Sequence, residues 1–114
     1  MKKVALLIAL VVLISTPLAV QAETMRTAHI SPDIAYNGNI ATCTARITGN
    51  SADEYLEAII QLWRGNVCVD TWEKTGNGYI FFSEDVAIVQ GRRHTLTVDL
   101  WVNGVAQERV SVSK

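Results

Sequence analysis

The sequence predicts an all-β fold, a single sandwich of about seven antiparallel strands, from two observations. Apolar and polar residues alternate along several segments, which is the period of a strand with one buried face. Turn-forming residues separate these segments: Asn37-Gly38, Gly49-Asn50, Gly65-Asn66, Gly76-Asn77-Gly78, Gln90-Gly91 and Asn103-Gly104. No helical periodicity of useful length follows Ala22.

Seven segments are expected to form the strands. They are residues 27–35, 39–48, 55–64, 66–74, 78–89, 93–102 and 105–113. The alternation is clearest in the sixth segment, where Leu96, Val98, Leu100 and Val102 share one side. In the second segment the same parity turns Cys43 toward the core. Pro32 suits an edge strand, because proline cannot donate a hydrogen bond to a neighbouring strand.

The register of the last hairpin depends on its loop. A plain two-residue turn at Asn103-Gly104 would pair Val98 with Arg109 and place an arginine in the core. A shift by one residue pairs Val98 with Val110 instead. We therefore expect a three-residue loop, with Gly104 in the left-handed conformation and a bulge.

One segment, 51–58, also has helical features, namely good helix formers after a start that resembles a capping box. A helix there would be short and isolated. A loop that runs into a strand is the preferred interpretation, because tertiary context overrides weak local propensity.

The first 22 residues have the features of a signal peptide. Lys2 and Lys3 precede an apolar run, and Val20-Gln21-Ala22 offers small residues at the cleavage positions. Cleavage would divide the chain into a signal peptide, 1–22, and one domain of 92 residues, 23–114. An uncleaved anchor is the alternative, since the apolar stretch approaches the length of a membrane span. The expected location is secreted or at the cell surface.

Charge and cysteine content narrow the function further. Residues 23–114 hold eight Lys and Arg against eleven Asp and Glu, a formal charge of −3, which disfavours nucleic-acid binding. Cys43 and Cys68 are the only two cysteines, so a disulfide is expected in an exported domain. Two separate reduced thiols are the alternative.

The order of features resembles a family of small exported β-sandwich proteins. Residues 37–43 lead into a strand, Leu62 closes the next, Trp72 ends a fourth, and Gly91 precedes a Thr/Val-rich strand. This is similar to immunoglobulin- or fibronectin-III-like proteins of uncharacterised function from Gram-positive bacteria. The resemblance implies an immunoglobulin-like sandwich and an extracellular setting, with no catalytic or ligand residues. The cysteines depart from the antibody pattern, because the sixth strand lacks one and Cys68 falls in the fourth.

No pattern of catalytic or cofactor-binding residues is present. His29 and His94 lie in no recognisable nucleophile setting, and no phosphate-binding loop, paired Cys-x-x-Cys or calcium loop occurs. Carboxylates are plentiful, but on a small domain they are usually a solvated surface. We expect no enzyme, no cofactor and no metal site.

Tryptophans suggest where a ligand binds. By strand parity Trp63 and Trp101 project from the outer face of the sheet that holds the third and sixth strands, near Gln61 and Asp99. Aromatic side chains there form a platform for a sugar ring or a protein. Alternatively, they cover strand backbone or pack on arginines.

A short basic cluster, Arg92-Arg93-His94, follows a turn. It suits an anionic polymer or a carboxylate, or else is a solvated loop end.

The sequence thus favours a non-catalytic extracellular binding or adhesion module, whose partner is an unknown protein or glycan. One alternative is a secreted inhibitor or immunity-type protein that acts through the loops at 49–51 and 76–78. Another is a carbohydrate-binding domain that uses Trp63 and Trp101. No membrane contact is expected after signal cleavage, and the oligomeric state is open.

Overall fold

The computed structural model describes residues 28–114 of the chain. The predicted signal peptide, 1–22, and the first residue of the first predicted strand lie outside the described residues. The described part contains strands, turns and loops, and within it no helix is long and apolar enough to cross a membrane.

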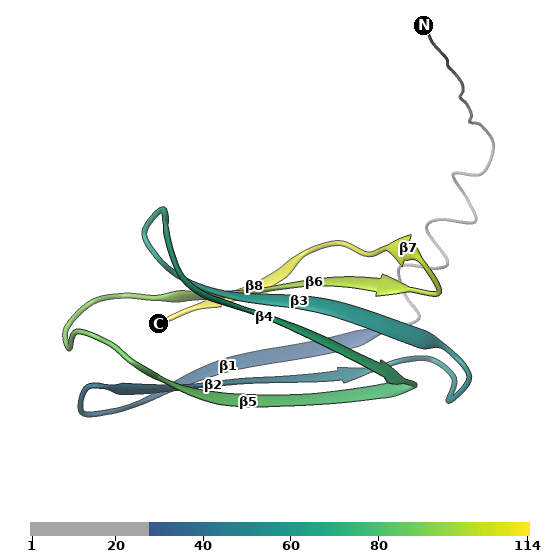
Figure 1. The fold of residues 1–114 in the computed structure, drawn as a ribbon, viewed down its shortest axis with the longest axis horizontal. Helices are drawn as coiled ribbons and strands as arrows, with labels where there is room; N and C mark the ends of the chain where they lie inside the picture. The colour runs from purple at the N-terminus through teal and green to yellow at the C-terminus, as the bar shows by residue number, and fades with distance from the viewer. Residues whose placement is uncertain (1–27) are drawn as a thin grey trace, which may run out of the picture.

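Eight strands follow one another along the described chain (Figure 1). They are β1 (His29–Asn37), β2 (Ile40–Thr48), β3 (Tyr55–Arg64), β4 (Val67–Asn77), β5 (Tyr79–Ala87), β6 (Thr95–Val102), β7 (Val105–Ala106) and β8 (Val110–Ser113). The first six match the predicted segments to within a few residues at each end. The seventh predicted segment, 105–113, is divided into β7 and β8.

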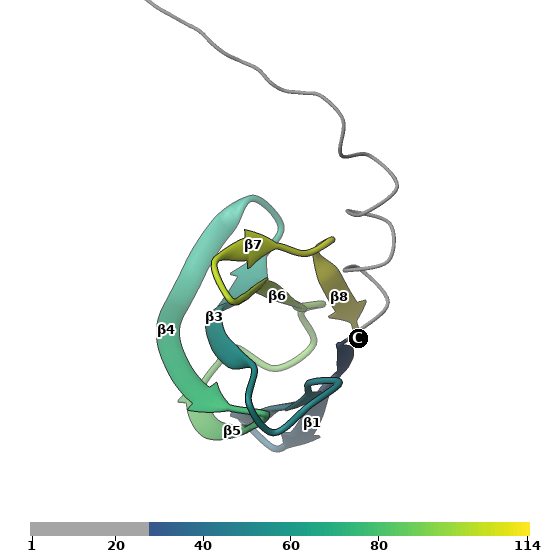
Figure 2. The same ribbon diagram turned by 90° about the vertical axis from the view of Figure 1, so that its right-hand side faces the viewer.

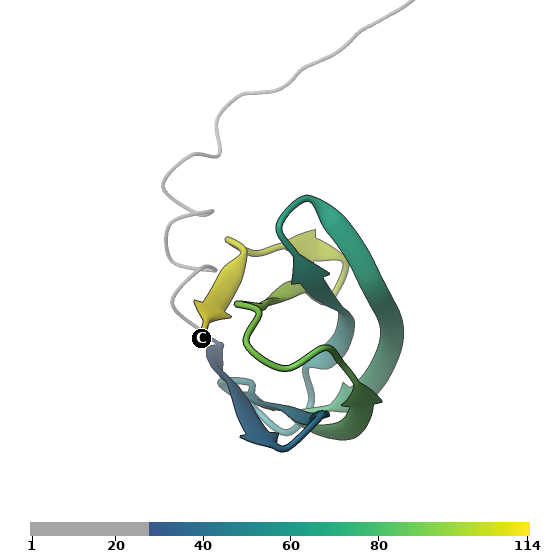
Figure 3. The ribbon, with the colours of Figure 1, turned by 90° about the vertical axis from the view of Figure 1, so that its left-hand side faces the viewer.

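The strands form two antiparallel sheets. One has the order β1-β2-β5, and in the other β4, β3 and β6 lie side by side, with β7 and β8 both paired to β6. The end views show the sheets as two layers that face one another (Figures 2 and 3). The all-β prediction is confirmed, and Pro32 lies on the edge strand β1.

The core lies between the layers and is built by the predicted alternation. Its fully buried members are Ile34, Ala41, Cys43, Ala45, Ile47, Leu56, Ala58, Ile60, Leu62, Ile80, Phe82, Leu96, Val98, Leu100 and Val102. Trp72 packs at the rim, with its ring centroid 4.9 Å from that of Phe82. Full burial of one such large apolar side chain contributes about 1.5–3 kcal/mol.

A single residue, Gly78, separates β4 in one sheet from β5 in the other. Its φ is +74°, and a Cβ there would lie 2.7 Å from the Cα of Ala52. Its N–H donates to the Glu54 carbonyl, and its carbonyl accepts the Gly49 N–H, both at 2.8 Å. Only glycine fits this crossing between sheets.

The segment with mixed propensity is a turn that leads into β3. The Glu54 N–H donates to the Ser51 carbonyl at 3.2 Å, and the Glu54 carboxylate accepts the Asn50 N–H at 2.7 Å. These contacts resemble a capping box, yet the chain becomes extended at Tyr55. The preference for a loop that runs into a strand is confirmed.

The last hairpin has the predicted pairing but not the predicted loop. Val98 pairs with Val110, and Gly104 is left-handed with φ +82°. The loop is a two-residue turn, because Asn103 is also left-handed with φ 50° and Val102 pairs directly with Val105. Two left-handed residues match the twist of the flanking strands. The extra residue is taken up at 107–109, between β7 and β8.

Candidate functional site

All four predicted ligand-binding residues lie on one surface, which we name the tryptophan face. It is the outer face of β3 and β6. The register pairs Trp63 with Thr95, Gln61 with Thr97, Ile59 with Asp99 and Glu57 with Trp101. Inward neighbours such as Leu62 and Leu100 are buried in the core, so these side chains point away from it.

The two tryptophans lie at opposite ends of this face. Glu57, the partner of Trp101, lies six positions before Trp63 on β3. At about 3.3 Å per residue this places the two indoles roughly 20 Å apart along the strands. They therefore provide two separate aromatic surfaces, with Gln61 and Asp99 between them.

The Trp63 end is held together by internal hydrogen bonds. The Trp63 indole N–H donates to the Thr97 hydroxyl at 3.2 Å, and Thr97 itself is buried. The Gln61 amide donates to the Thr71 hydroxyl at 3.3 Å. The polar groups of Trp63 and Gln61 are therefore hydrogen-bonded within the fold, where a ligand would otherwise contact them.

The Asp99 carboxylate also has an intramolecular partner. Both of its carboxylate oxygens accept hydrogen bonds from the Arg109 guanidinium at 2.8 Å. This hydrogen-bonded pair raises the pKa of Arg109. The Arg109 side chain is half exposed, so the pair adds little to stability.

The Trp101 end differs, because it borders a shallow hollow of about 310 Å³, which we name the Trp101 hollow. It is lined by Glu57, Ala58, Ile59, Glu73, Lys74, Thr75, Trp101 and Gly104. Glu57 and Glu73 are exposed, and within residues 28–114 neither forms an ion pair. The Trp101 indole, the Ile59 side chain, two carboxylates and the Lys74 side chain meet here.

Carboxylate oxygens accept hydrogen bonds, and an indole offers a flat apolar surface. The Trp101 hollow can therefore hold a ligand that is apolar on one face and carries hydroxyl or other donor groups at its edge.

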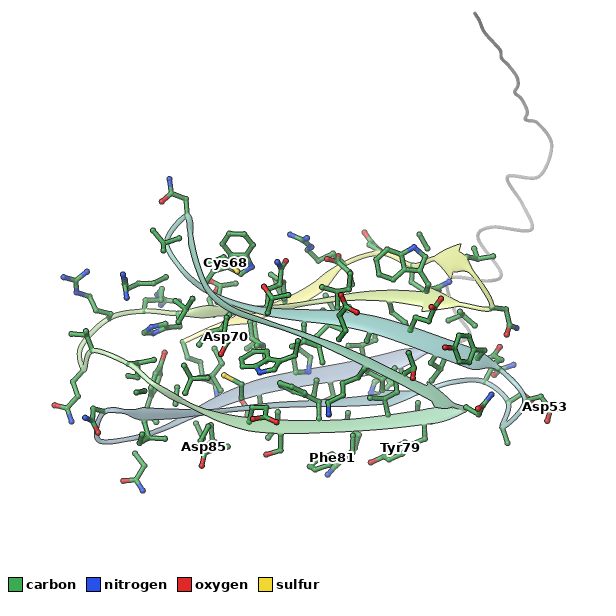
Figure 4. All side chains as sticks on the ribbon, in the orientation of Figure 1. Asp53, Cys68, Asp70, Tyr79, Phe81 and Asp85 are labelled. Carbon is green, nitrogen blue, oxygen red and sulfur yellow. The ribbon has the colours of Figure 1, made fainter. Side chains whose placement is uncertain are left out.

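A second aromatic surface was missed by the sequence analysis. Tyr79 and Phe81, on β5, are 48% and 52% exposed on the outer face of the other sheet (Figure 4). The Arg46 guanidinium lies over the Phe81 ring, 5.4 Å from its centroid. The sequence could have predicted their outward orientation, because they alternate with the inward Ile80 and Phe82.

The expected disulfide is absent, since Cys43 and Cys68 are both free. Cys43 is fully buried between the sheets, and burial raises the pKa of its thiol to about 11. Cys68 is exposed, with its sulfur 3.3 Å from the Thr71 hydroxyl oxygen (Figure 4). The Cys43–Cys68 prediction was wrong for this structure.

A bulge in β4 explains the error. Leu62 pairs with Asp70 but Trp63 pairs with Cys68, so Val69 is an extra residue on β4. In regular alternation Cys68 would share the inward parity of Trp72. The extra residue reverses that parity, so Val69 packs against the core and Cys68 turns outward.

Among the described residues, no group of three or more His, Cys, Asp or Glu side chains is placed to hold a metal ion. His29 is exposed and His94 is buried at the base of the loop before β6.

Comparison with known proteins gives little beyond this geometry. No protein-family model matches the sequence, and no curated protein matches it. The structure is similar to part of Bacteroides uniformis beta-glucuronidase 2, solved covalently bound to cyclophellitol-6-carboxylate aziridine, with a TM-score of 0.48 and 14% identity. The match covers 77% of this chain and 13% of that chain. A likeness at this level carries no argument about function.

Proposed function

We propose that the protein is a non-catalytic extracellular binding module with an immunoglobulin-like sandwich. The topology is supported by the strand order, with β1-β2-β5 in one sheet and β4-β3-β6-β8 neighbours in the other. Third and sixth strands that pair at the centre of one sheet are a feature of that architecture. The extracellular setting is supported by the N-terminal sequence pattern.

The observation that carries the binding function is the Trp101 hollow. Along the tryptophan face, Trp63, Gln61 and Asp99 have intramolecular partners, whereas Glu57 and Glu73 have no ion-pair partner among residues 28–114. A carbohydrate is the ligand class that this surface supports best. The sugar ring stacks on the Trp101 indole, and its hydroxyls donate to Glu57 and Glu73.

A glycan-array and polysaccharide pull-down experiment tests this function. It uses the protein recovered from cells that express the full chain, together with a Trp101→Ala variant. Loss of a central aromatic contact costs about 2 kcal/mol, so we expect the glycan Kd to rise roughly thirtyfold. Phe81→Ala is the matched control, because it removes an exposed aromatic from the other sheet.

Thermal unfolding shows that each variant remains folded. Binding that survives in folded Trp101→Ala protein contradicts the Trp101 hollow as the site. Absence of any glycan ligand contradicts the carbohydrate class, and protein partners of the exposed Tyr79 and Phe81 surface become the next search.

A further inference from the structure

A separate hollow lies at one end of the sandwich, away from the tryptophan face, and we name it the end hollow. Its volume is about 380 Å³. It is lined by Tyr36, Gly38, Ile88, Gln90, Gly91, Arg92, Arg93 and Lys114. The β1–β2 turn, the β5–β6 loop and the last residue meet at this end, which faces the viewer in Figure 3.

The end hollow is basic. Two arginines and a lysine line it, and no Asp or Glu side chain does, although the main-chain carboxylate of Lys114 also lies at this end. Lys114 is paired with Asp33 at 2.7 Å, which leaves Arg92 and Arg93 without an ion pair among residues 28–114. Residues 28–114 contain seven Lys and Arg and ten Asp and Glu, so their formal net charge is negative. Two arginines without an ion pair therefore differ in charge from the protein as a whole. The loop at the opposite end carries Asp53 (Figure 4).

The loop that carries the arginines is tied down at both ends. The Ile88 N–H donates to the Asn39 carbonyl of the β1–β2 turn at 2.8 Å. At the other end, His94 and Lys114 exchange main-chain hydrogen bonds of 2.9 and 3.0 Å. Gly91, at the tip, has no neighbour within 4 Å of where a Cβ would lie, so the tip itself is open.

A buried histidine supports the hollow from below. His94 is fully buried, and its Nδ1 lies 3.0 Å from the Arg92 carbonyl oxygen and 3.2 Å from the Tyr36 hydroxyl. That hydroxyl in turn donates to a main-chain carboxylate oxygen of Lys114 at 2.8 Å. Both contacts are made by Nδ1 and hold the main chain of Arg92 against β1 and the last residue, whereas Nε2 is buried with no hydrogen-bond partner among residues 28–114. His94 is thus a positioning residue for the arginine loop.

From this arrangement we infer that the end hollow binds an anionic group, a carboxylate or a phosphate, through the guanidinium groups of Arg92 and Arg93. A guanidinium presents its donors as a planar fork that matches either group. The wall formed by Tyr36 and Ile88 accommodates the less polar part of the molecule that carries the anion. This inference does not rest on the Trp101 hollow.

The test is an NMR titration of the protein recovered from cells that express the full chain. Sodium phosphate is one probe and sodium acetate the other, and sodium chloride holds the ionic strength constant. We expect saturable shifts of the amide resonances at 90–94 and Lys114, with a dissociation constant on the order of 1 mM for two charge-assisted contacts. The probe that saturates at the lower concentration identifies the anion.

Two double variants remove the same charge at different places. Arg92→Ala/Arg93→Ala is expected to weaken binding by about tenfold or more. Arg46→Ala/Arg64→Ala, whose side chains do not line the end hollow, is expected to bind as the unaltered protein does. Resonances outside the end hollow report whether each variant is folded.

The inference is overturned by shifts that fail to saturate with either probe. Equal binding by the Arg92→Ala/Arg93→Ala protein also overturns it. So does equal weakening in both double variants, because net charge would then be the cause.

Discussion

The two ends of the tryptophan face carry the same residue type in different roles. At one end the Trp63 indole donates to buried Thr97, beside a bulge and the exposed Cys68. At the other end Trp101 borders an open hollow with two glutamates that form no ion pair among residues 28–114. Outward orientation alone therefore does not identify a binding residue. A tryptophan whose neighbouring polar groups are bonded within the fold is structural, whereas one whose neighbouring polar groups are free can bind a ligand.

The largest expected difference between the two ends is in stability. Trp63→Ala removes a half-buried ring and leaves Thr97 without its donor, so we expect the free energy of unfolding to fall by about 2–3 kcal/mol. Trp101→Ala also removes a half-buried ring but leaves no buried hydroxyl without its donor, so a smaller fall of about 1 kcal/mol is expected. Urea unfolding of both variants measures the difference. Equal losses of unfolding free energy would mean that the two tryptophans contribute equally to stability.

The next effect concerns Cys43. Its predicted disulfide partner, Cys68, is turned outward by the bulge in β4. Its pKa is about 11 in the folded state, against an ordinary value of 9.0. A raised folded pKa stabilises the protein below pH 9, and this contribution is lost as pH rises from about 9 to 11, by about 2 kcal/mol at most.

Urea unfolding between pH 8 and 11 follows this loss. Other groups titrate in the same range, so the control is Cys43→Ala, for which we expect a flatter pH dependence. Identical slopes in the two proteins would contradict a buried thiol.

The smallest expected effect lies midway between the ends. Asp99→Asn breaks a solvent-exposed ion pair with Arg109, and we expect a loss of about 0.5 kcal/mol that high salt removes. Thermal unfolding at low and high salt measures it. Glycan binding should be unchanged, because Asp99 is occupied by Arg109. Weaker binding in this variant would extend the site toward Trp63.

Much of the fold was predictable from alternation. The inward rows of β2 and β6 were assigned correctly, because one buried face imposes a period of two on each strand. Pro32 identified an edge strand for a similar reason, since it lacks a donor. The paired residues of the last hairpin were also predicted, because only one register keeps Arg109 out of the core.

The errors arose where one residue is inserted without a sequence marker. Val69 is a β-branched residue in a run of strand formers, and nothing local distinguishes it as a bulge. In the last hairpin the extra residue lies at 107–109 rather than in the turn. In both cases the strand can absorb the residue at several positions, and packing against the opposite sheet selects among them.

The sequence by itself determined which face most strand residues occupy and where the chain turns, because alternation and glycine conformation are local properties. It therefore placed Trp63, Trp101, Gln61 and Asp99 on one surface. Only the tertiary structure decided how far apart they lie, which of them have partners, and that Cys68 faces away from Cys43. Those outcomes depend on the register between strands distant in sequence, where backbone hydrogen bonds are alike in every register and side-chain packing makes the choice.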